Sequence, residues 1–467
     1  MSLSSQEIAR IVDTVVQRLD GKAESSGKHP AGIFENLDDA VAAATRAQKQ
    51  IKNLDMRAKI IQAMRAAGEK HARELAELAV QETGMGRVED KILKNISQSQ
   101  KTPGIEDLQP QALSGDHGLT LTENAAWGVI ASVTPSTNPA ATVINNSISM
   151  VSAGNAVVFA PHPGAKRVSL RAITILNEAI VSAGGPPNLL TTVAEPSIES
   201  AQQLFIYPGI DLLVVTGGEG VVEAARKMTN KRLMAAGAGN PPVVVDETAD
   251  ITKAATAIAF GASFDNNILC TDEKEIIAVD SIADQLKQEL KKHKAVELTP
   301  AQTEDLAKKI LNGYPGEKPV INRKFVGRNA SVIAKEIGLS VPEDTRLLFT
   351  ETQKNHPFAV IELMMPVIPL IRVPDADTAI DTAKELERGL RHTAAMHSRN
   401  IDNMHRMANE INTSIFVKNG PCAAGLGFGG EGWTSMTITT PTGEGVTSAR
   451  TFVRLRRCVI VDHFRIV

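Results

Sequence analysis

The chain alternates short apolar runs with amphipathic stretches from residue 126 onward. The runs are apolar throughout, as expected for strands buried on both faces of a sheet, and the stretches between them repeat apolar residues with helical spacing. This alternation predicts βαβ units, and therefore a mostly parallel sheet covered by helices. The first series predicts strands at 128–133, 156–160, 189–193 and 211–215 and helices at 138–152, 166–182, 197–205 and 219–228.

A second α/β series begins after the apolar run at 242–245. Residues 36–100 instead indicate helices alone, with breaks at 53–55 and 83–86. A chain of 467 residues is too long for one hydrophobic core, so we expect two or three domains. The second series predicts strands at 276–279, 367–372, 394–397 and 415–417 and helices at 281–292, 300–312, 375–388 and 400–410.

The last segment, at 434–467, departs from this pattern. It holds two β-rich runs, at 451–455 and 458–461, and few helix signals. A β-rich tail without its own core is expected to add to a sheet, in this chain or in a partner subunit. We therefore expect an oligomerisation element here.

The first 20 residues predict a separate amphipathic helix. A polar segment follows, and we treat residues 21–32 as a linker. A tethered helix of this kind docks either on the main body or on another protein, and we favour the second. Its polar face mixes acidic and basic residues, which argues against a membrane surface. Its apolar stripe consists of Ile8, Ile11, Val12, Val15, Val16 and Leu19.

Composition argues against several classes of function. The net charge of −3 provides no basic field for nucleic acid, and no apolar run approaches the ~18 residues of a membrane span. Three cysteines are too few for a disulfide framework and indicate a reducing compartment. Neither Cys-x-x-Cys nor His-Glu-x-x-His occurs, so no metal site is expected.

Cys270 is the strongest candidate for chemistry. It follows the polar segment Asp265-Asn266-Asn267, whereas a cysteine that only packs usually stands among apolar residues. A cysteine can attack a carbonyl and hold the acyl group as a thioester. The upstream small-residue loop 235–241 contains no carboxylate that would activate water. These residues leave open whether water or a stronger nucleophile accepts the acyl group from Cys270.

Two strand ends are candidates for binding a dinucleotide. Thr216-Gly217-Gly218 follows a strand and opens a helix, a junction that presents backbone N–H groups to an anion, although a plain βα turn is the alternative. Ala160-Pro161-His162-Pro163 ends a neighbouring strand, and dinucleotides lie across such ends. The run 425–430 matches the dinucleotide fingerprint literally, but no helix follows it, so we expect a loop lining an active site.

Four segments carry a resemblance to the aldehyde dehydrogenase superfamily. Residues 264–270 resemble its nucleophile segment, and 134–139 resemble its strand–turn before a helix. Thr216-Gly217-Gly218 resembles its cofactor-phosphate turn, and 362–367 resembles the segment whose glutamate holds the nicotinamide ribose. The resemblance runs in order through nearly all of residues 33–467. It implies two doubly wound α/β domains, at 33–242 for the dinucleotide and 243–433 for the catalytic cysteine, with the β-rich tail as an oligomerisation extension.

Finer details resemble the CoA-acylating branch of that family. They are Asn266-Asn267, His392-Thr393-Ala394 and 429–432. Within the branch, the chain is similar to the acetaldehyde and propionaldehyde dehydrogenases of bacterial microcompartments, and most similar to the ethanolamine-utilisation type. This resemblance implies that acetaldehyde, CoA and NAD yield acetyl-CoA and NADH, reversibly, in a homo-oligomer (dimer or tetramer) inside a cytoplasmic microcompartment. Residues 1–20 are then expected to bind a shell protein.

Alternatives to this activity remain. One is a propionaldehyde-preferring enzyme of propanediol utilisation, and another is a hydrolytic aldehyde dehydrogenase. Glutamyl-phosphate reductases share the scaffold and also use a cysteine thioester, with NADPH and phosphate. A non-catalytic shell-assembly protein would belong to a different class, but Cys270, Glu362 and the Thr216-Gly217-Gly218 turn are all present.

The resemblance also assigns the site residues. Cys270 is the expected nucleophile, and its backbone N–H is expected to stabilise the oxyanion together with Asn138, which is offset by one position from the asparagine of the superfamily. His392 is expected to handle the proton of the CoA thiol. Hydrolytic relatives carry a general-base glutamate where we place Ala235, and a lysine and glutamate where this chain has Pro161-His162-Pro163. The missing glutamate at Ala235 disfavours water as the acceptor of the acyl group. The missing lysine and glutamate leave open whether the cofactor is NAD or NADP. Expected cofactor contacts are Thr134, Pro135, Pro161, His162, Thr216, Gly217, Gly218, Gly237 and Glu362.

Overall fold

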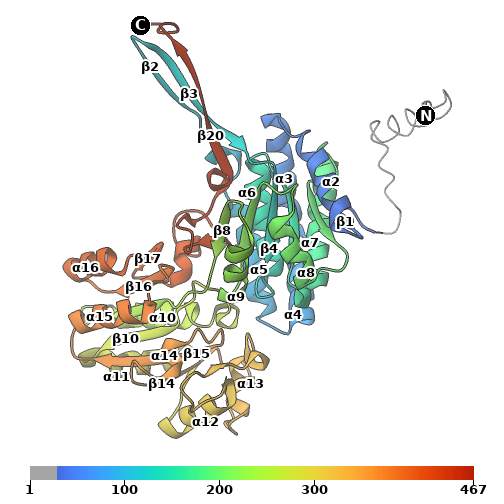
Figure 1. Cartoon of the computed structure of the whole chain (residues 1–467). Helices are drawn as coiled ribbons and strands as arrows, with labels where there is room; N and C mark the ends of the chain where they lie inside the picture. Colours follow the sequence, from blue (N-terminus) through green and yellow to red (C-terminus); the bar gives the residue numbers. More distant parts are fainter. Residues whose placement is uncertain (1–28) are drawn as a thin grey trace, which may run out of the picture.

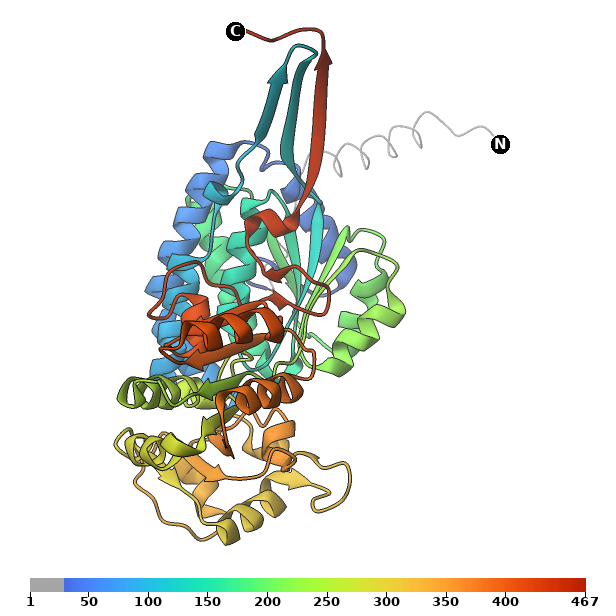
Figure 2. The same ribbon diagram turned by 90° about the vertical axis from the view of Figure 1, so that its left-hand side faces the viewer.

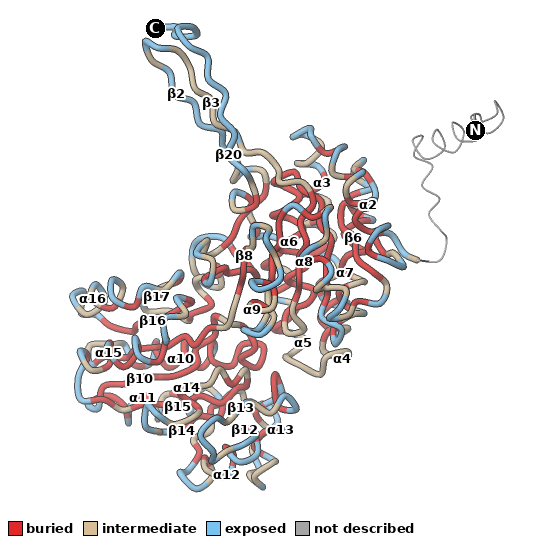
Figure 3. The backbone as a smooth tube through the Cα atoms, in the orientation of Figure 1, coloured by how far each residue is buried: buried red, intermediate tan, exposed pale blue. Residues whose placement is uncertain are grey.

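The computed structural model describes residues 29–467, and two separate parallel sheets form its core (Figure 1). The expected N-terminal helix and most of its linker lie outside the described residues. The two series of apolar runs correspond to the two sheets, so the α/β fold with two doubly wound units is confirmed. Buried backbone is concentrated in these sheets and in the helices that face them (Figure 3).

The first sheet has six strands in the order β1-β6-β5-β4-β7-β8, and all neighbours are parallel. Every residue of β4, β5 and β6 is buried, which explains their unbroken apolar sequences. The strands are β1 (Ile33–Phe34), β4 (Val129–Thr134), β5 (Ala156–Pro161), β6 (Leu190–Val193), β7 (Leu212–Thr216) and β8 (Leu233–Ala236). The helices are α2 (Leu37–Gln48), α3 (Leu54–Lys70), α4 (Ala72–Thr83), α5 (Val88–Lys101), α6 (Pro139–Ser152), α7 (Lys166–Ser182), α8 (Ile198–Ile206) and α9 (Glu219–Met228).

The strand order of this sheet reverses at β4. The chain moves outward from β4 through β5 to β6, and then returns to place β7 and β8 on the other side of β4. In doubly wound sheets a crevice opens at the carboxyl ends of the strands at such a reversal. The ends of β4, β5 and β7 are therefore the place to look for a ligand.

The second sheet has seven parallel strands in the order β11-β14-β15-β10-β9-β16-β17. The strands are β9 (Pro242–Val245), β10 (Glu275–Val279), β11 (Ala295–Glu297), β14 (Leu347–Glu351), β15 (Val367–Val373), β16 (Thr393–His397) and β17 (Ile415–Lys418). The helices are α10 (Ile251–Gly261), α11 (Asp280–Lys291), α12 (Pro300–Ile310), α13 (Ala330–Lys335), α14 (Pro357–Val360), α15 (Ala376–Glu387) and α16 (Ile401–Ile411). The 3-10 turn η3 (Phe264–Asn267) connects α10 to the segment that carries Cys270.

The tail forms an arm that projects from the body (Figures 1 and 2). Its strand β20 (Val453–Val461) pairs antiparallel with β3 (Gly118–Ala126), which pairs with β2 (Gln111–Gly115). The tail therefore adds to a sheet, as expected, but as one strand rather than two and onto a hairpin of the same chain that the sequence did not predict. Among the described residues, no helix combines the length and apolar character needed to span a membrane.

Candidate active site

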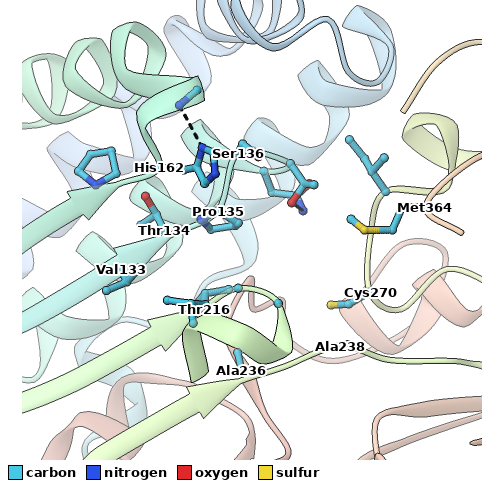
Figure 4. A pocket seen from close by; sticks show the side chains of 18 of the residues that line it. Val133, Thr134, Pro135, Ser136, His162, Thr216, Ala236, Ala238, Cys270 and Met364 are labelled. Carbon is cyan, nitrogen blue, oxygen red and sulfur yellow. Dashed lines mark hydrogen bonds between the residues drawn. The ribbon is translucent and has the colours of Figure 1, made fainter. Parts of the chain in front are cut away.

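A cavity of about 1000 Å³ lies between the two sheets. The carboxyl ends of β4, β5, β7 and β8 form one wall, and Cys270 and Met364 stand opposite (Figure 4). Glu362 also lines the cavity. All nine expected cofactor-contact residues line it, as do Cys270 and Asn138. His392 is not among the lining residues. The structure thus brings together eleven of the twelve predicted site residues in one cavity.

The turn after β7 has the predicted strand–turn–helix geometry. Thr216 ends the strand, Gly218 has an extended backbone conformation at the N-cap, and α9 begins at Glu219. A Cβ on Gly217 would come within 2.6 Å of the Val221 side chain, so glycine is needed for this close turn. Backbone N–H groups at the start of α9 therefore face the cavity, where an anionic group can be bound.

Three cationic side chains that were not predicted from the sequence also line the cavity. Arg323, Lys324 and Arg328 line the cavity from the loop around η4 (Arg323–Phe325). Desolvation, and then the Arg323 charge, lower the pKa of His162, whose Nδ1 accepts a hydrogen bond from the Gly164 N–H (3.0 Å; Figure 4). No sequence pattern marks these cations, because they meet the strand ends only through the packing of the second domain on the first.

Three consecutive residues before Cys270 have left-handed backbone conformations. The φ angles of Asp265, Asn266 and Asn267 are 46°, 58° and 62°. Asn and Asp tolerate this region because their short polar side chains form local hydrogen bonds. Asn266 Nδ2 donates to the Gly327 carbonyl oxygen (2.8 Å), and Asn267 Nδ2 donates to the Ala262 carbonyl oxygen (2.9 Å). The polar approach to Cys270 therefore sets the direction of the chain at the nucleophile.

Buried charges surround Cys270. Its side chain is of intermediate exposure, but desolvation and the nearby Glu362 carboxylate raise the pKa of its thiol to about 12, against the opposing charge of Lys274. Lys274 is itself buried, and its Nζ donates to the backbone oxygens of Asn267 (2.9 Å) and Leu269 (3.1 Å). The thiol is therefore protonated at neutral pH in the protein without bound ligands.

Glu362 stands against the small-residue loop as well as the thiol. Its carboxylate accepts a hydrogen bond from the Gly239 N–H, yet burial dominates and raises the pKa of Glu362. The other carboxylate on the described cavity wall is Glu82, which accepts from the N–H groups of Arg167 (2.7 Å) and Val168 (2.9 Å) and so caps α7. Of the acids whose charges raise the pKa of Cys270, Glu362 has the larger effect and Asp272 the smaller.

The small-residue loop that begins at Ala235 meets the cavity through the residues that follow Ala235. Successive side chains of a strand point to opposite faces. Ala235 is fully buried in the core behind β8, whereas Ala236 ends that strand and lines the cavity with Gly237 and Ala238. Ala236, not Ala235, therefore belongs to the cavity wall, and the loop that follows it carries no acid.

His392 lies one layer behind the cavity wall. Burial, and then the Lys274 charge, lower its pKa to about 4, so the ring is neutral at pH 7. Its Nδ1 lies 2.9 Å from Thr393 Oγ1, and its Nε2 has no hydrogen-bond partner among the described residues. A Cβ on Gly239 would meet the Cys270 carbonyl oxygen at 2.7 Å and His392 Cγ at 2.9 Å. His392 and the Cys270 backbone therefore both lie against the Cβ side of Gly239, where a larger side chain would clash with them.

Residues 15–308 match the sequence profile of the aldehyde dehydrogenase family. Two acetylating acetaldehyde dehydrogenases named EutE are similar over the full length of both chains, at 66% identity for Salmonella typhimurium and 64% for Escherichia coli. A CoA-propanoylating propanal dehydrogenase of Salmonella typhimurium is 44% identical over 99% of this chain and all of its own.

Solved structures are similar in fold. A propionaldehyde dehydrogenase from the fucose-utilisation microcompartment of Clostridium phytofermentans is 44% identical (TM-score 0.91; 94% of this chain and 100% of that chain). A Rhodopseudomonas palustris propionaldehyde dehydrogenase with bound CoA and an acylated cysteine is 47% identical (TM-score 0.90; 92% and 98%). An engineered glycolyl-CoA reductase with bound NADP+ is 47% identical (TM-score 0.89; 92% and 98%).

The Glu362→Gln variant tests the electrostatics of the nucleophile. Removing the carboxylate charge should lower the pKa of Cys270, and each unit of decrease raises the thiolate fraction about tenfold while pH stays below the pKa. We therefore expect iodoacetamide to alkylate Cys270 faster at pH 8 to 9 without cofactor. The alkylation rate is measured by mass spectrometry of the Cys270 peptide. Glu82→Gln, on the same cavity wall, is the matched control and should alkylate at the wild-type rate. An unchanged rate in Glu362→Gln would contradict this electrostatic account.

Proposed function

We infer that this chain, which belongs to the aldehyde dehydrogenase family, is a CoA-acylating acetaldehyde dehydrogenase. It oxidises acetaldehyde and transfers the acetyl group to CoA through an acyl-cysteine. Full-length relatives at 64–66% identity carry this activity in their names, and a similar structure holds CoA beside an acylated cysteine. The observation in this chain that carries the inference is Cys270 on a large cavity whose neighbouring loop, from Ala236 onward, has no acid to activate water.

Acylation begins at Cys270. Its thiol gives its proton to solvent in the cavity, Sγ bonds to the aldehyde carbon, and the carbonyl electrons move to oxygen. The Cys270 backbone N–H and the Asn138 amide are our candidates for donating to that oxyanion. The thiol proton is the obstacle, because burial, and then the Glu362 charge, raise the pKa of Cys270 to about 12. Drawing Glu362 toward the ribose of a bound dinucleotide would remove the opposing carboxylate from the thiol.

The cavity fits a nicotinamide dinucleotide. The α9 N-terminus and the Gly217 turn suit a diphosphate, and Glu362 is placed to bind a ribose. The remaining expected contacts are Thr134, Pro135, Pro161, His162, Thr216, Gly218 and Gly237. When bound, a nicotinamide would supply the acceptor for hydride. Loss of hydride from the adduct would convert it to a thioester on Cys270. We propose NAD as the cofactor of this chain. NADP+ is bound in the similar engineered glycolyl-CoA reductase.

Transfer to CoA completes the reaction. The CoA thiolate attacks the thioester carbon, the bond to Sγ breaks, and Cys270 leaves as thiolate. His392 is the proposed group that handles the CoA thiol proton. Its neutral ring, its Nε2, which is unpartnered within residues 29–467, and its place beside the Cys270 backbone at Gly239 support that role.

Two assembly properties belong to the same proposal. The arm formed by β2, β3 and β20 projects from the body and carries exposed apolar side chains, among them Leu113 (73% exposed) and Leu455 (73%). A second copy of this chain is the proposed partner of the arm, which gives a dimer or tetramer. Residues 1–20 are proposed to bind a microcompartment shell protein, in keeping with the microcompartment origin of a similar structure.

Omitting CoA tests the acceptor. With acetaldehyde and NAD, we expect continuous NADH formation to slow by at least about tenfold without CoA, because water is poorly activated. Cys270→Ala should form no NADH with or without CoA. Repeating the assay with NADP, and with propionaldehyde, decides cofactor and substrate preference. Equal rates with and without CoA would place the chain among the hydrolytic enzymes.

His392→Ala separates the two half-reactions. The first turnover, seen as a burst of NADH, should keep its rate, whereas steady-state turnover with CoA should fall by about a hundredfold because thiol proton transfer is lost. His397→Ala is the matched control, since His397 is buried at the end of β16, the strand that begins one residue after His392, and burial also lowers its pKa to about 4. A His392→Ala enzyme in which burst and steady state fall together would disprove the assignment.

Deleting residues 1–20 should leave kcat and KM unchanged but abolish co-purification with microcompartment shells. Within the full chain, Val12→Asp interrupts the apolar stripe and should have the same effect. Gln17→Asp adds the same charge on the polar face and should retain binding. Shell association that survives both the deletion and Val12→Asp would refute a role for this segment.

A further inference from the structure

A cluster of buried charges lies beside the nucleophile turn and takes no part in the steps above. Lys91 and Lys94 on α5 are 3% and 1% exposed, and Asp265 on η3 is fully buried. Lys91 Nζ lies 2.9 Å from Asp265 Oδ2, and Lys94 Nζ donates to the same oxygen. Lysines are rarely buried this completely unless they are paired, because removing an ammonium group from water is costly. Pairing two buried lysines with one carboxylate leaves an excess of positive charge in the interior, and such an arrangement needs an explanation.

The cluster fixes the nucleophile segment to the first domain. Asp265 Oδ1 accepts from the Arg87 N–H (2.7 Å), and the Asp265 N–H donates to Asp90 Oδ2 (3.0 Å). Arg346 continues the cluster with a 3.0 Å bond to the same Asp90 oxygen. The start of α5 therefore holds both the backbone and the carboxylate of Asp265, which stands at the start of the left-handed turn leading to Cys270.

Lys94 also reaches the opposite side of the site. Its Nζ donates to Asn138 Oδ1, at the N-cap of α6. An ammonium group can only donate, so the amide oxygen must face Lys94 and the NH₂ group must face away from it. Asn138 lines the same cavity as Cys270. Its Nδ2 donates one hydrogen to Thr137 Oγ1 (3.2 Å), which leaves the second for a substrate oxygen.

We propose that Lys94 is a positioning residue for the acyl-transfer chemistry. Its ammonium group orients the Asn138 amide so that an N–H points to the reacting carbonyl, and through Asp265 it fixes that amide relative to Cys270. The Asn138 amide is thus the group through which Lys94 acts on the oxyanion site. The inference rests on the role proposed above for Asn138. Lys91 differs, because it bonds Asp265 and the Thr137 backbone oxygen (3.0 Å) but not the Asn138 amide.

A double-mutant cycle tests the proposal. The variants are Lys94→Met, Asn138→Ala and the two combined, measured by the rate of the first NADH burst with acetaldehyde, the KM for NAD and Tm. Loss of one oxyanion donor typically lowers the rate by about 10²-fold, and we expect that loss in each single variant. The KM for NAD should change by less than about threefold, because these substitutions should not alter how NAD binds in the ground state. The double variant should be no slower than Asn138→Ala, since Lys94 acts through that amide.

Asn95→Ala is the structural control. Asn95 follows Lys94 on α5, is 3% exposed and bonds the Ala72 carbonyl oxygen (3.1 Å), so its loss should lower Tm while leaving the burst rate unchanged. If Lys94→Met does not fold, Lys94→Gln replaces it. Glutamine keeps a hydrogen bond but can present either end to Asn138, so a slower burst is again expected.

Three results would overturn the proposal. A Lys94→Met enzyme that loses Tm but keeps its burst, while Asn138→Ala is slow, would reduce Lys94 to a structural tie and leave the role of Asn138 intact. Multiplying losses in the double variant would mean that the two residues act separately. A wild-type burst in Asn138→Ala would remove Asn138 from the oxyanion site, and Lys94 with it.

Discussion

The left-handed turn at Asp265, Asn266 and Asn267 is the constraint on which the rest of the site depends. Left-handed backbone costs roughly 1 kcal/mol or more for each residue other than glycine, so a run of three needs support from outside. That support comes from different regions of the protein: α5 holds Asp265, the loop around Gly327 holds Asn266, and the carbonyl groups of Ala262 and Glu273 hold Asn267. Cys270 leaves this turn facing the strand ends of the other domain.

The chemistry follows from what surrounds the cysteine. The strand ends and the α9 N-terminus form one wall, while the loop from Ala236 to Ala238 presents backbone and small side chains. Glu362, from a separate segment, supplies a charge that opposes the thiolate. A thioester formed here is protected from hydrolysis because no base of that loop can activate water, and a thiol nucleophile is then the better acceptor.

Much of this fold could be predicted from the sequence, because doubly buried parallel strands leave unbroken apolar runs whose ends matched the structure to within about one residue. The hairpin of β2 and β3 was missed, although residues 119–122 alternate apolar and polar side chains, because no residue of either strand is buried and the unbroken apolar runs used for the other strands are absent. The two predicted tail strands are one, because the polar pair Arg456-Arg457 is tolerated in an exposed arm. Cys270 and the Thr216 turn were visible as local motifs. Lys94 and the cations around Arg323 were not, because only tertiary packing brings them to the site.

The central claim is that Cys270 carries an acyl group between an aldehyde and CoA. It is tested most directly by mass spectrometry of the enzyme mixed with acetaldehyde and NAD, before and after CoA is added. The account predicts one acetyl group per chain, located on Cys270, that persists without CoA and disappears on its addition with formation of acetyl-CoA. An enzyme that forms NADH with no acetyl group on Cys270, or whose acetyl group is lost to water as fast as to CoA, would contradict it.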